Sequence, residues 1–172
     1  MRTALALGGG TCLRDDINRV PIHFDGVVAC NDAGFEYEGD LDAWCSLHPK
    51  KFPTWVKRRQ VNGYSEVSKF YAHAESKEWG CEKTPYILPD MSGSGSSGLM
   101  AAKVALIDLG FDRVIMCGIP MMPISHFFDD HAWKSCHHFR KHWRTISTEY
   151  RHRIRSMSGW SRLFFGGPGD WE

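Results

Sequence analysis

The sequence predicts an α/β protein with an open, mostly parallel sheet that helices cover on both faces, which makes three layers. Two observations predict this fold. Short apolar runs alternate with helical segments along the chain, and several of these runs end on glycine or on a small polar residue. The run "DRVIMCG" at 112–118 is also apolar throughout its centre, as parallel strands buried on both faces are.

The first half of the chain is expected to supply three strands and two helices. The run "TALAL" at 3–7 is the first strand, and Thr11 is the expected N-cap of the short helix that follows its glycines. The runs "GVVACND" at 26–32 and "AWCSLHP" at 43–49 are the second and third strands, and a helix is expected over 53–60.

The second half is expected to continue the alternation. The segment "EVSKFYAHA" at 66–74 fits either a strand or a short helix, and "PYIL" at 85–88 is a strand candidate. Residues 99–109 are apolar on nearly every side, which predicts a helix buried against the sheet, and the strand at 112–118 follows it.

Charge is unevenly distributed, although the net charge is only +1. Between Val20 and Pro49 there are acids but no Lys or Arg, whereas the segment from Lys134 to Arg162 contains eight Lys or Arg and the single acid Glu149. This segment is expected to form one long basic helix, because apolar residues recur in it at steps of three and four. They are Trp133, Cys136, Phe139, Trp143, Ile146 and Tyr150.

The composition predicts a single domain over residues 1–172. With 172 residues, 42% of them hydrophobic, the chain can bury a full core, and its Gly- and Pro-rich end at 166–172 is expected to fray. Six cysteines without a CxxC pair indicate reduced thiols. No apolar run approaches the ~18 residues of a membrane span, so the sequence predicts a cytoplasmic protein without a membrane partner.

The residues that bind a ligand are expected beyond the carboxyl ends of the strands, where open parallel sheets place their crevices. Glycines let the backbone approach a ligand closely, and free amides at a helix start attract phosphate, so the crevice suits a nucleotide or another phosphorylated molecule. The motif "GGGTCL" lacks the GxGxxG spacing and no Walker lysine follows, which argues against NAD and P-loop sites. The expected binding residues are Gly8, Gly9, Gly10, Thr11, Asn31, Asp32, His48, Ser96, Ser97, Gly98, Gly118, Ile119 and Pro120.

The stretch "DMSGSGSSG" at 90–98 has the composition of a flexible linker. A linker separates two independent cores, but the strands before it and the helix and strand after it form one predicted sheet. The stretch is therefore interpreted as a ligand-binding loop.

The segments "LALGGGTCL", "FDGVVACNDA" and "GSSGLMAAKVALIDLGFDRVIMCGIPM" resemble the nucleotide-sugar-dependent transferases of the bacterial sialyltransferase type and the related hydroxymethylpterin diphosphokinase-like domains. The match covers roughly 1–35 and 92–122, and the chain looks like the short stand-alone versions found in tailed phages. The resemblance implies a Rossmann-like domain and a glycosyltransferase-like enzyme that acts on a nucleotide-linked donor, in the host cytoplasm if a phage encodes it.

The resemblance also implies a role for each binding segment. The turn 8–11 and Asn31 would line the phosphate and sugar side of the donor, residues 96–98 would hold its phosphate or sugar acid, and residues 118–120 would lie near the base.

Three departures from the family pattern stand out. Gly9 replaces the usual Asn, Pro120 replaces the aspartate of "GID", and no Tyr occurs between Tyr86 and Tyr150, so the tyrosine pair that steadies the leaving phosphate is absent. These departures argue against sialyl transfer in particular.

The family places a histidine general base beyond the last of these strands. His131 is the first candidate here and His126 the second. The carboxylate of Asp129 would orient the imidazole, which then removes a proton from the hydroxyl of the acceptor. The alternative is that "DDH" is only a helix-capping turn.

Other chemistry remains open at this point. His138 and His142, four residues apart, could converge with His131 on zinc, but no HExxH motif is present and no metal site is predicted. A divalent cation held by Asp32 with a nucleotide diphosphate would suit a diphosphokinase-like phosphotransferase. A non-catalytic protein that binds or sequesters a nucleotide ligand is a further alternative. The basic segment would suit a nucleic-acid or other polyanionic acceptor, unless it is only a solvated face.

Overall fold

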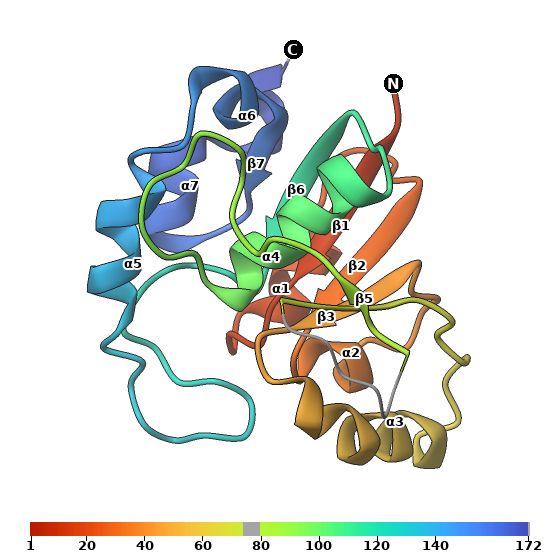
Figure 1. The fold of residues 1–172 in the computed structure, drawn as a ribbon. Coiled ribbons are helices and arrows are strands. Elements are labelled where there is room, and N and C mark those ends of the chain that lie inside the picture. The colour runs from red at the N-terminus through yellow and green to blue at the C-terminus, as the bar shows by residue number, and fades with distance from the viewer. Residues whose placement is uncertain (74–79, 172) are drawn as a thin grey trace.

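The predicted open α/β sheet is confirmed. A computed structural model describes residues 1–73 and 80–171 of the chain. Within them the sheet has seven strands in the order β5-β4-β3-β2-β1-β6-β7, and every neighbouring pair is parallel (Figure 1). The strands are β1 (Thr3–Leu7), β2 (Gly26–Cys30), β3 (Ala43–Ser46), β4 (Phe70–Ala72), β5 (Glu82–Lys83), β6 (Arg113–Cys117) and β7 (Ile154–Ser156).

Helices cover both faces of this sheet. They are α1 (Leu13–Asn18), α2 (Ala33–Glu36), α3 (Phe52–Val61), α4 (Ser97–Lys103), α5 (Cys136–Trp143), α6 (Thr148–Arg153) and α7 (Gly159–Phe165), with short helices η1 (Pro49–Lys51), η2 (Val104–Asp108) and η3 (Pro168–Trp171). The π-helical η2 continues α4 without a break, which places the apolar segment expected over 99–109 on one helical path.

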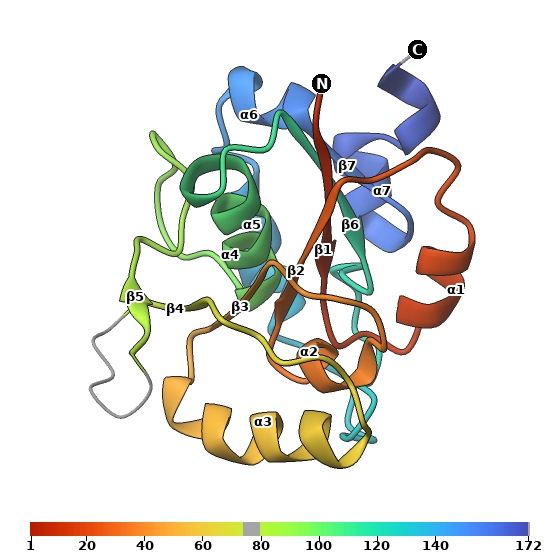
Figure 2. The ribbon, with the colours of Figure 1, turned by 90° about the vertical axis from the view of Figure 1, so that its right-hand side faces the viewer.

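Each face of the sheet has its own hydrophobic core, because side chains alternate along a strand. Ala4 and Ala6 of β1 belong to the core beneath α4, whereas Leu5 and Leu7 belong to the core beneath α1, α2 and α3. Figure 2 shows α4 and α1 on opposite sides of the strands. Because Ala4 and Ala6 are small, α4 can lie close to this face of the sheet.

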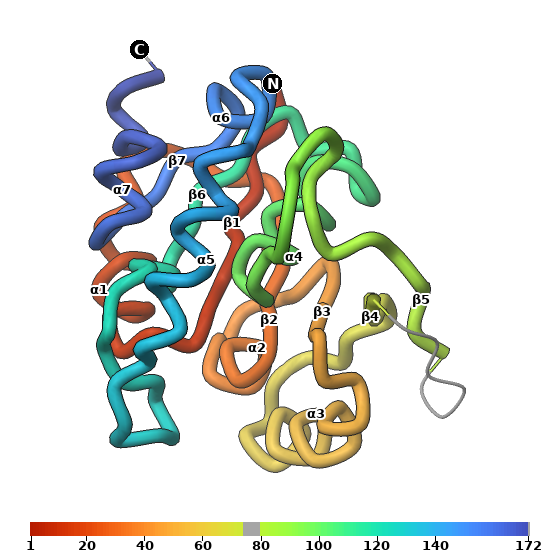
Figure 3. Tube along the Cα trace, turned by 60° about the vertical axis from the view of Figure 1, so that its left-hand side comes forward, coloured from red at the N-terminus to blue at the C-terminus, as the bar shows by residue number. Residues whose placement is uncertain are grey.

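The strands are added first on one side of β1 and then on the other. From β1 the chain proceeds outward through β2, β3 and β4 to β5, and it then returns to the other side of β1 to form β6 and β7 (Figure 3). The carboxyl ends of β1 and β6 therefore flank the topological switch point, where open α/β sheets bind ligands.

The basic segment forms two short helices, α5 and α6, instead of the one long helix that the apolar spacing predicts. The helix is interrupted over 144–147, where Thr145 Oγ1 donates to the carbonyl oxygen of His142 (2.7 Å) and accepts the amide of Ser92 (3.0 Å). Such local bonds of Ser and Thr side chains compete with helical hydrogen bonds, and an apolar spacing does not reveal them.

The strand expected over 85–88 is also absent, since β5 lies earlier at Glu82–Lys83 and the segment 85–88 is irregular. Pro85 is its first residue and Pro89 follows its last, and proline has no amide proton for a sheet ladder. The ambiguous segment 66–74 contains the strand β4, and its last residue, Ala74, lies outside the described residues.

Residues 166–171, for which the sequence predicts fraying, dock onto the domain through η3. Trp171 Nε1 donates to the carbonyl oxygen of His152 (2.9 Å), and the guanidinium of Arg113 lies over its ring at 4.6 Å. The side chain of Trp171 anchors this segment, which its glycine and proline content does not predict. In the described chain no helix has the length and apolarity needed to cross a bilayer.

Candidate functional site

Two glycine turns, one after β1 and one after β6, pack against each other at the switch point. The amide of Gly8 donates to the carbonyl oxygen of Cys117 and that of Gly10 to the carbonyl oxygen of Gly118, both at 2.9 Å. A Cβ at Gly8 or Gly10 would lie 2.8 Å from the Gly118 oxygen, and Gly118 itself has a φ of +67°. Packing of the two turns therefore requires these glycines even without a ligand.

Gly9 differs from its neighbours because a side chain there would meet no backbone atom of the turn after β6. A Cβ there would meet only Cδ2 of His126, at 3.2 Å. The amide of Gly9 has no hydrogen bond within the described chain, while its carbonyl oxygen accepts the amide of Phe127 (3.1 Å). Gly9 therefore offers a free amide to a ligand.

The start of α4 supplies further free amides. Ser96 is the N-cap, and its hydroxyl accepts the amide of Leu99 at 3.3 Å. The amides of Ser97 and Gly98 precede the first intrahelical bond and so have no partner within the helix. A Cβ at Gly98 would lie 2.7 Å from Cγ2 of Ile119, so the start of α4 packs closely on the turn after β6.

Asn31 is held in an unusual backbone conformation at the end of β2. Its φ of +49° is left-handed, and its carbonyl oxygen accepts Trp44 Nε1 at 2.8 Å. Its side-chain Oδ1 accepts the hydroxyl of Ser46 (2.8 Å), and that hydroxyl accepts the amide of His48 at 2.8 Å. These bonds fix the amide group of Asn31, so that its Nδ2 is left to donate to a ligand.

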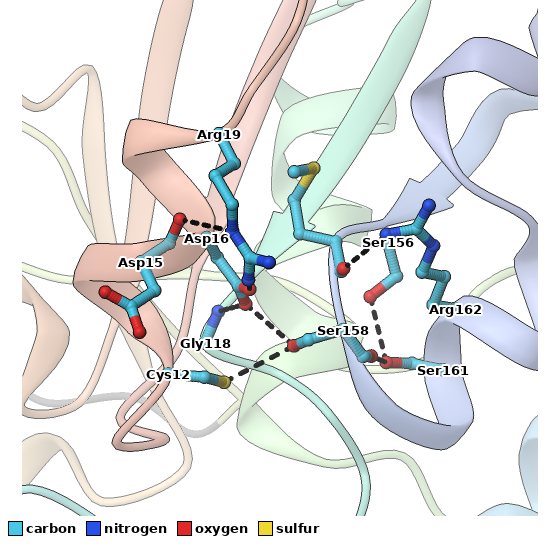
Figure 4. A network of polar contacts seen from close by, with 10 residues as sticks. Cys12, Asp15, Asp16, Arg19, Gly118, Ser156, Ser158, Ser161 and Arg162 are labelled. Atoms are coloured by element: carbon cyan, nitrogen blue, oxygen red, sulfur yellow. Dashed lines mark hydrogen bonds and ion pairs between the residues drawn. The ribbon is translucent and has the colours of Figure 1, made fainter.

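Asp16 of α1 ties the turn after β6 to two other segments (Figure 4). Its carboxylate is fully buried and accepts the amide of Gly118 (2.9 Å) and the hydroxyl of Ser158 (2.8 Å), and Arg19 lies 3.5 Å from its other oxygen. The Ser158 hydroxyl is also 3.3 Å from the thiol of Cys12. Burial raises the pKa of Cys12 to about 11, so this cysteine is a neutral structural thiol.

The turns and the start of α4 enclose a pocket of about 260 Å³ at the carboxyl ends of the central strands. Most of the residues that the sequence predicts for the site line this pocket. They are Gly8, Gly9, Gly10, Asn31, Asp32, His48, Ser96, Ser97, Gly98, Gly118, Ile119, Pro120 and His126.

His126 enters the pocket from the long loop between β6 and α5, seen at the lower left of Figure 1. The backbone of His126 pairs with that of Gly10 in an antiparallel arrangement outside the strands. Its ring makes an edge-to-face contact with Trp133, with 5.8 Å between the ring centroids. The second histidine candidate thus lies beside the glycine turn and against an aromatic wall.

His131 and Asp129 do not line the pocket. The His131 side chain is 95% exposed, and its Nδ1 lies 2.9 Å from Oδ1 of Asp129. Hydrogen bonds from the backbone and ring of His131 hold the pKa of Asp129 below its usual value. This arrangement is an exposed turn and not the cap of α5, whose N-cap is Ser135. Thr11 is exposed and does not line the pocket either. It is also not the N-cap of α1 that the sequence predicts, because that position belongs to Cys12.

Asp32 is the carboxylate that faces the pocket. Burial raises its pKa, and electrostatic interaction with Lys51, His126 and Arg58 opposes this shift. His126 and Asp32 therefore lie close enough to interact electrostatically across the pocket.

Sequence reasoning missed the apolar side of the pocket. Trp133 and Phe139 stack there with ring centroids 5.5 Å apart and an interplanar angle of 26°. Both belong to the apolar stripe from which a core helix is expected, so the periodicity does not reveal that they line the pocket. The lining residues that were not expected are Cys30, Leu47, Met121, Met122, Ile124, Ser125, Trp133 and Phe139.

The histidine pair on α5 is not part of a larger metal centre. His138 Nε2 and His142 Nε2 lie 3.3 Å apart, and within residues 1–73 and 80–171 no group of three or more His, Cys, Asp or Glu side chains is arranged to hold a metal ion.

The sheet order, the crevice at its switch point and the two loop-to-helix junctions define a Rossmann-like α/β fold. More narrowly, it is the fold of the bacterial sialyltransferases. An α-2,3-sialyltransferase from Campylobacter jejuni in apo form superposes with a TM-score of 0.61 at 16% identity, covering 98% of this chain and 79% of that one.

Two further solved structures of sialyltransferases share this fold. The sialyltransferase CST-II in complex with a trisaccharide acceptor and CMP gives a TM-score of 0.64 at 14% identity, covering 99% of this chain and 87% of that chain. The monofunctional α-2,3-sialyltransferase Cst-I from Campylobacter jejuni gives 0.52 at 13% identity, covering 98% and 80%. No protein-family model matches the sequence, and no curated protein is significantly similar to it.

Proposed function

We propose that this chain is a glycosyltransferase-like enzyme that binds a nucleotide-linked sugar donor in the switch-point pocket and uses His126 as its general base. One observation carries the proposal: the free amides of Gly9, Ser97 and Gly98 and the imidazole of His126 surround a single pocket. CMP is the first nucleotide to test, because CST-II was solved with it.

The donor phosphate is assigned to the glycine turn and to the start of α4. Among the lining residues that the structure describes there is no Lys or Arg, so backbone amides must supply most of the positive potential. Asn31 Nδ2 and the imidazole of His48 are the side-chain donors available on the same side of the pocket.

His126 is assigned the proton transfer. As the acceptor oxygen forms its bond to the anomeric carbon, the bond from that carbon to the phosphate oxygen breaks and the nucleotide leaves with the electron pair. The neutral imidazole takes the proton of the acceptor hydroxyl. His131, the first candidate from the sequence, is too exposed and too far outside the pocket lining for this role.

The acceptor is assigned to the aromatic side of the pocket. The stacked rings of Trp133 and Phe139 offer an apolar surface for the C–H face of a sugar, and the ring of His126 contacts Trp133. A sugar placed there would bring a hydroxyl next to the imidazole. The trisaccharide acceptor of CST-II supports an acceptor of this chemical class.

No Tyr lines the pocket within the described residues, in keeping with the missing tyrosine pair. The leaving phosphate would then depend on amides and imidazole. A panel of donors identifies the transferred sugar.

Turnover assays on wild type, His126→Ala and His131→Ala test the proposal. A panel of nucleotide sugars is first screened for an increase in melting temperature, since a ligand that binds only the folded state stabilises it. His126→Ala is expected to lose turnover by about 100-fold or more while nucleotide affinity stays within a few fold, and His131→Ala is expected to match wild type.

The same experiment separates the alternatives. Nucleotide binding without turnover of any donor would favour a protein that only binds or sequesters its ligand. Turnover that needs a divalent cation and Asp32 would favour the diphosphokinase-like alternative.

A further inference from the structure

A second pocket lies between α6 and α7, on a part of the chain that the proposed function does not use. It has a volume of about 240 Å³ and is lined by Thr148, Arg151, His152, Arg155, Phe164 and Phe165. Its polar lining therefore consists of two guanidinium groups, an imidazole and a hydroxyl, all of which can donate hydrogen bonds.

Cationic side chains gather around an aromatic pair beside this pocket. Trp160 and Phe164 of α7 stack with centroids 5.0 Å apart at 8°. The guanidiniums of Arg140 and Arg144 lie over Trp160 at 5.2 and 5.8 Å, and that of Arg151 lies over Phe164 at 4.4 Å. Contact with the rings orients these cations without neutralising them.

Carboxylates do not neutralise this positive charge. No residue from 134 to 162 forms an ion pair with a carboxylate in the described part of the chain. Arg140 Nη2 and Nε donate to the carbonyl oxygen of Met121 (2.6 and 2.8 Å), which is a neutral partner. Glu149 is the one acid of the segment, and it does not line the pocket.

Arg155 is fixed in the wall of the pocket by neutral partners. Its Nη1 donates to the carbonyl oxygens of Arg151, His152 and Ile154 (3.3, 3.3 and 2.8 Å), and its Nη2 donates to that of Asp170 at 3.4 Å. Its Nε is buried without a partner in the described residues. Burial lowers the pKa of Arg155 and the Asp170 charge only partly opposes this, so the site carries a desolvation cost that a bound anion would offset.

We propose that the pocket between α6 and α7 binds a phosphate group, with Arg151 as its principal charged contact and Phe164 as the apolar wall beside it. Arginine is suited to phosphate because its planar fork donates two parallel hydrogen bonds. The phosphate can belong to a small phosphorylated molecule or to the backbone of a nucleic acid, and both sources share this chemistry.

Calorimetric titration of inorganic phosphate into the full chain tests this proposal. Saturating CMP occupies the switch-point pocket, so that phosphate can bind only elsewhere. If CMP does not bind, the difference in pyrophosphate affinity between Arg151→Gln and Arg153→Gln still reports on the α6/α7 pocket, because neither arginine lines the switch-point pocket. Arg151→Gln removes the charge, and Arg153→Gln is the matched control, because Arg153 is on the same helix but outside the pocket lining. Thr148→Val is a second test variant that leaves the charges intact.

Phosphate is expected to bind in the presence of CMP, about ten-fold more weakly in Arg151→Gln, and unchanged in Arg153→Gln. No binding, or an equal loss in both arginine variants, would overturn the proposal, the latter because it indicates a diffuse charge effect. A single-stranded oligonucleotide that binds more tightly than phosphate, with an affinity that falls steeply with salt, would identify the backbone source. Tighter binding of pyrophosphate would identify a small-molecule source.

Discussion

The amide of Gly10 donates a 2.9 Å hydrogen bond to the carbonyl oxygen of Gly118, and this bond joins the turns after β1 and β6. The two strands are neighbours in the sheet, but the turns are more than a hundred residues apart in the chain. The walls of the candidate donor pocket are therefore held by contacts between backbones, and side chains at these positions would separate them.

Replacement of Gly118 by Ala tests this interlock. A Cβ at Gly118 would overlap the carbonyl oxygen of Gly8, and the left-handed φ of +67° adds strain. Gly110→Ala is a matched control, because Gly110 has a φ of +68° and open space around its Cβ position. We expect the control to cost about 1 kcal/mol and Gly118→Ala about 2 kcal/mol more in urea unfolding. Equal losses would contradict the interlock.

Replacement of Asp16 by Ala should destabilise the fold by about 3 kcal/mol, because it leaves the buried amide of Gly118 and the hydroxyl of Ser158 without their shared acceptor. Asp15→Ala on the same helix changes an exposed side chain and should cost less than about 0.5 kcal/mol. The free energy of unfolding is the measurement. A loss in Asp16→Ala as small as that in Asp15→Ala would show that the network in Figure 4 does not anchor the turn.

Asp32→Asn should stabilise the unliganded protein at neutral pH. Burial raises the pKa of Asp32, so over the acidic range above its unfolded pKa the folded state retains a proton that the unfolded state releases, and stability falls as the pH rises. The gain in melting temperature from Asp32→Asn is therefore expected near pH 7 and should shrink as the pH is lowered toward about 4. Asp15→Asn serves as the exposed control. A gain that does not change with pH would contradict the burial argument.

Trp133→Ala should separate acceptor use from donor use, if the aromatic wall holds the acceptor. Transfer to an oligosaccharide should fall by about ten-fold or more, while CMP affinity and hydrolysis of the donor by water should remain. Phe128→Ala is the control, because Phe128 is 47% exposed on the same loop and does not line the pocket. Equal losses of transfer and of CMP affinity would place Trp133 on the donor side instead.

The strands with continuous apolar runs could be predicted from the sequence, because burial on both faces leaves a clear signal. The runs at 3–7 and 112–118 appear as β1 and β6 with bounds within a residue or two. The short edge strand β7 gives no such signal, since Ile154–Ser156 contains a charged residue and lies within the basic segment. At the break between α5 and α6, Thr145 also accepts the amide of Ser92, and a contact between such distant parts of the chain leaves no local signal in the sequence.

The glycine turns and the start of α4 in the candidate site could be predicted, because glycines and small polar residues that follow strands mark the crevice of a parallel sheet. Which of His126 and His131 lines the pocket could not be predicted, because both lie in one irregular loop and only the path of that loop brings His126 to Gly10. Trp133 was hidden by its fit to the apolar stripe of the segment that follows it.

Titration of CMP into wild type and into Gly9→Val tests the central claim most directly. A side chain at Gly9 would project toward His126 and occupy the pocket. Within 4 Å among the described residues its Cβ would crowd only Cδ2 of the His126 side chain, at 3.2 Å, and no backbone, so the fold should persist. We expect CMP to bind wild type at one site and about ten-fold or more weakly to Gly9→Val, with similar melting temperatures for the two proteins. Failure of wild type to bind CMP or any other nucleotide, or equal affinity in Gly9→Val, would contradict the assignment of this pocket to a nucleotide-linked donor.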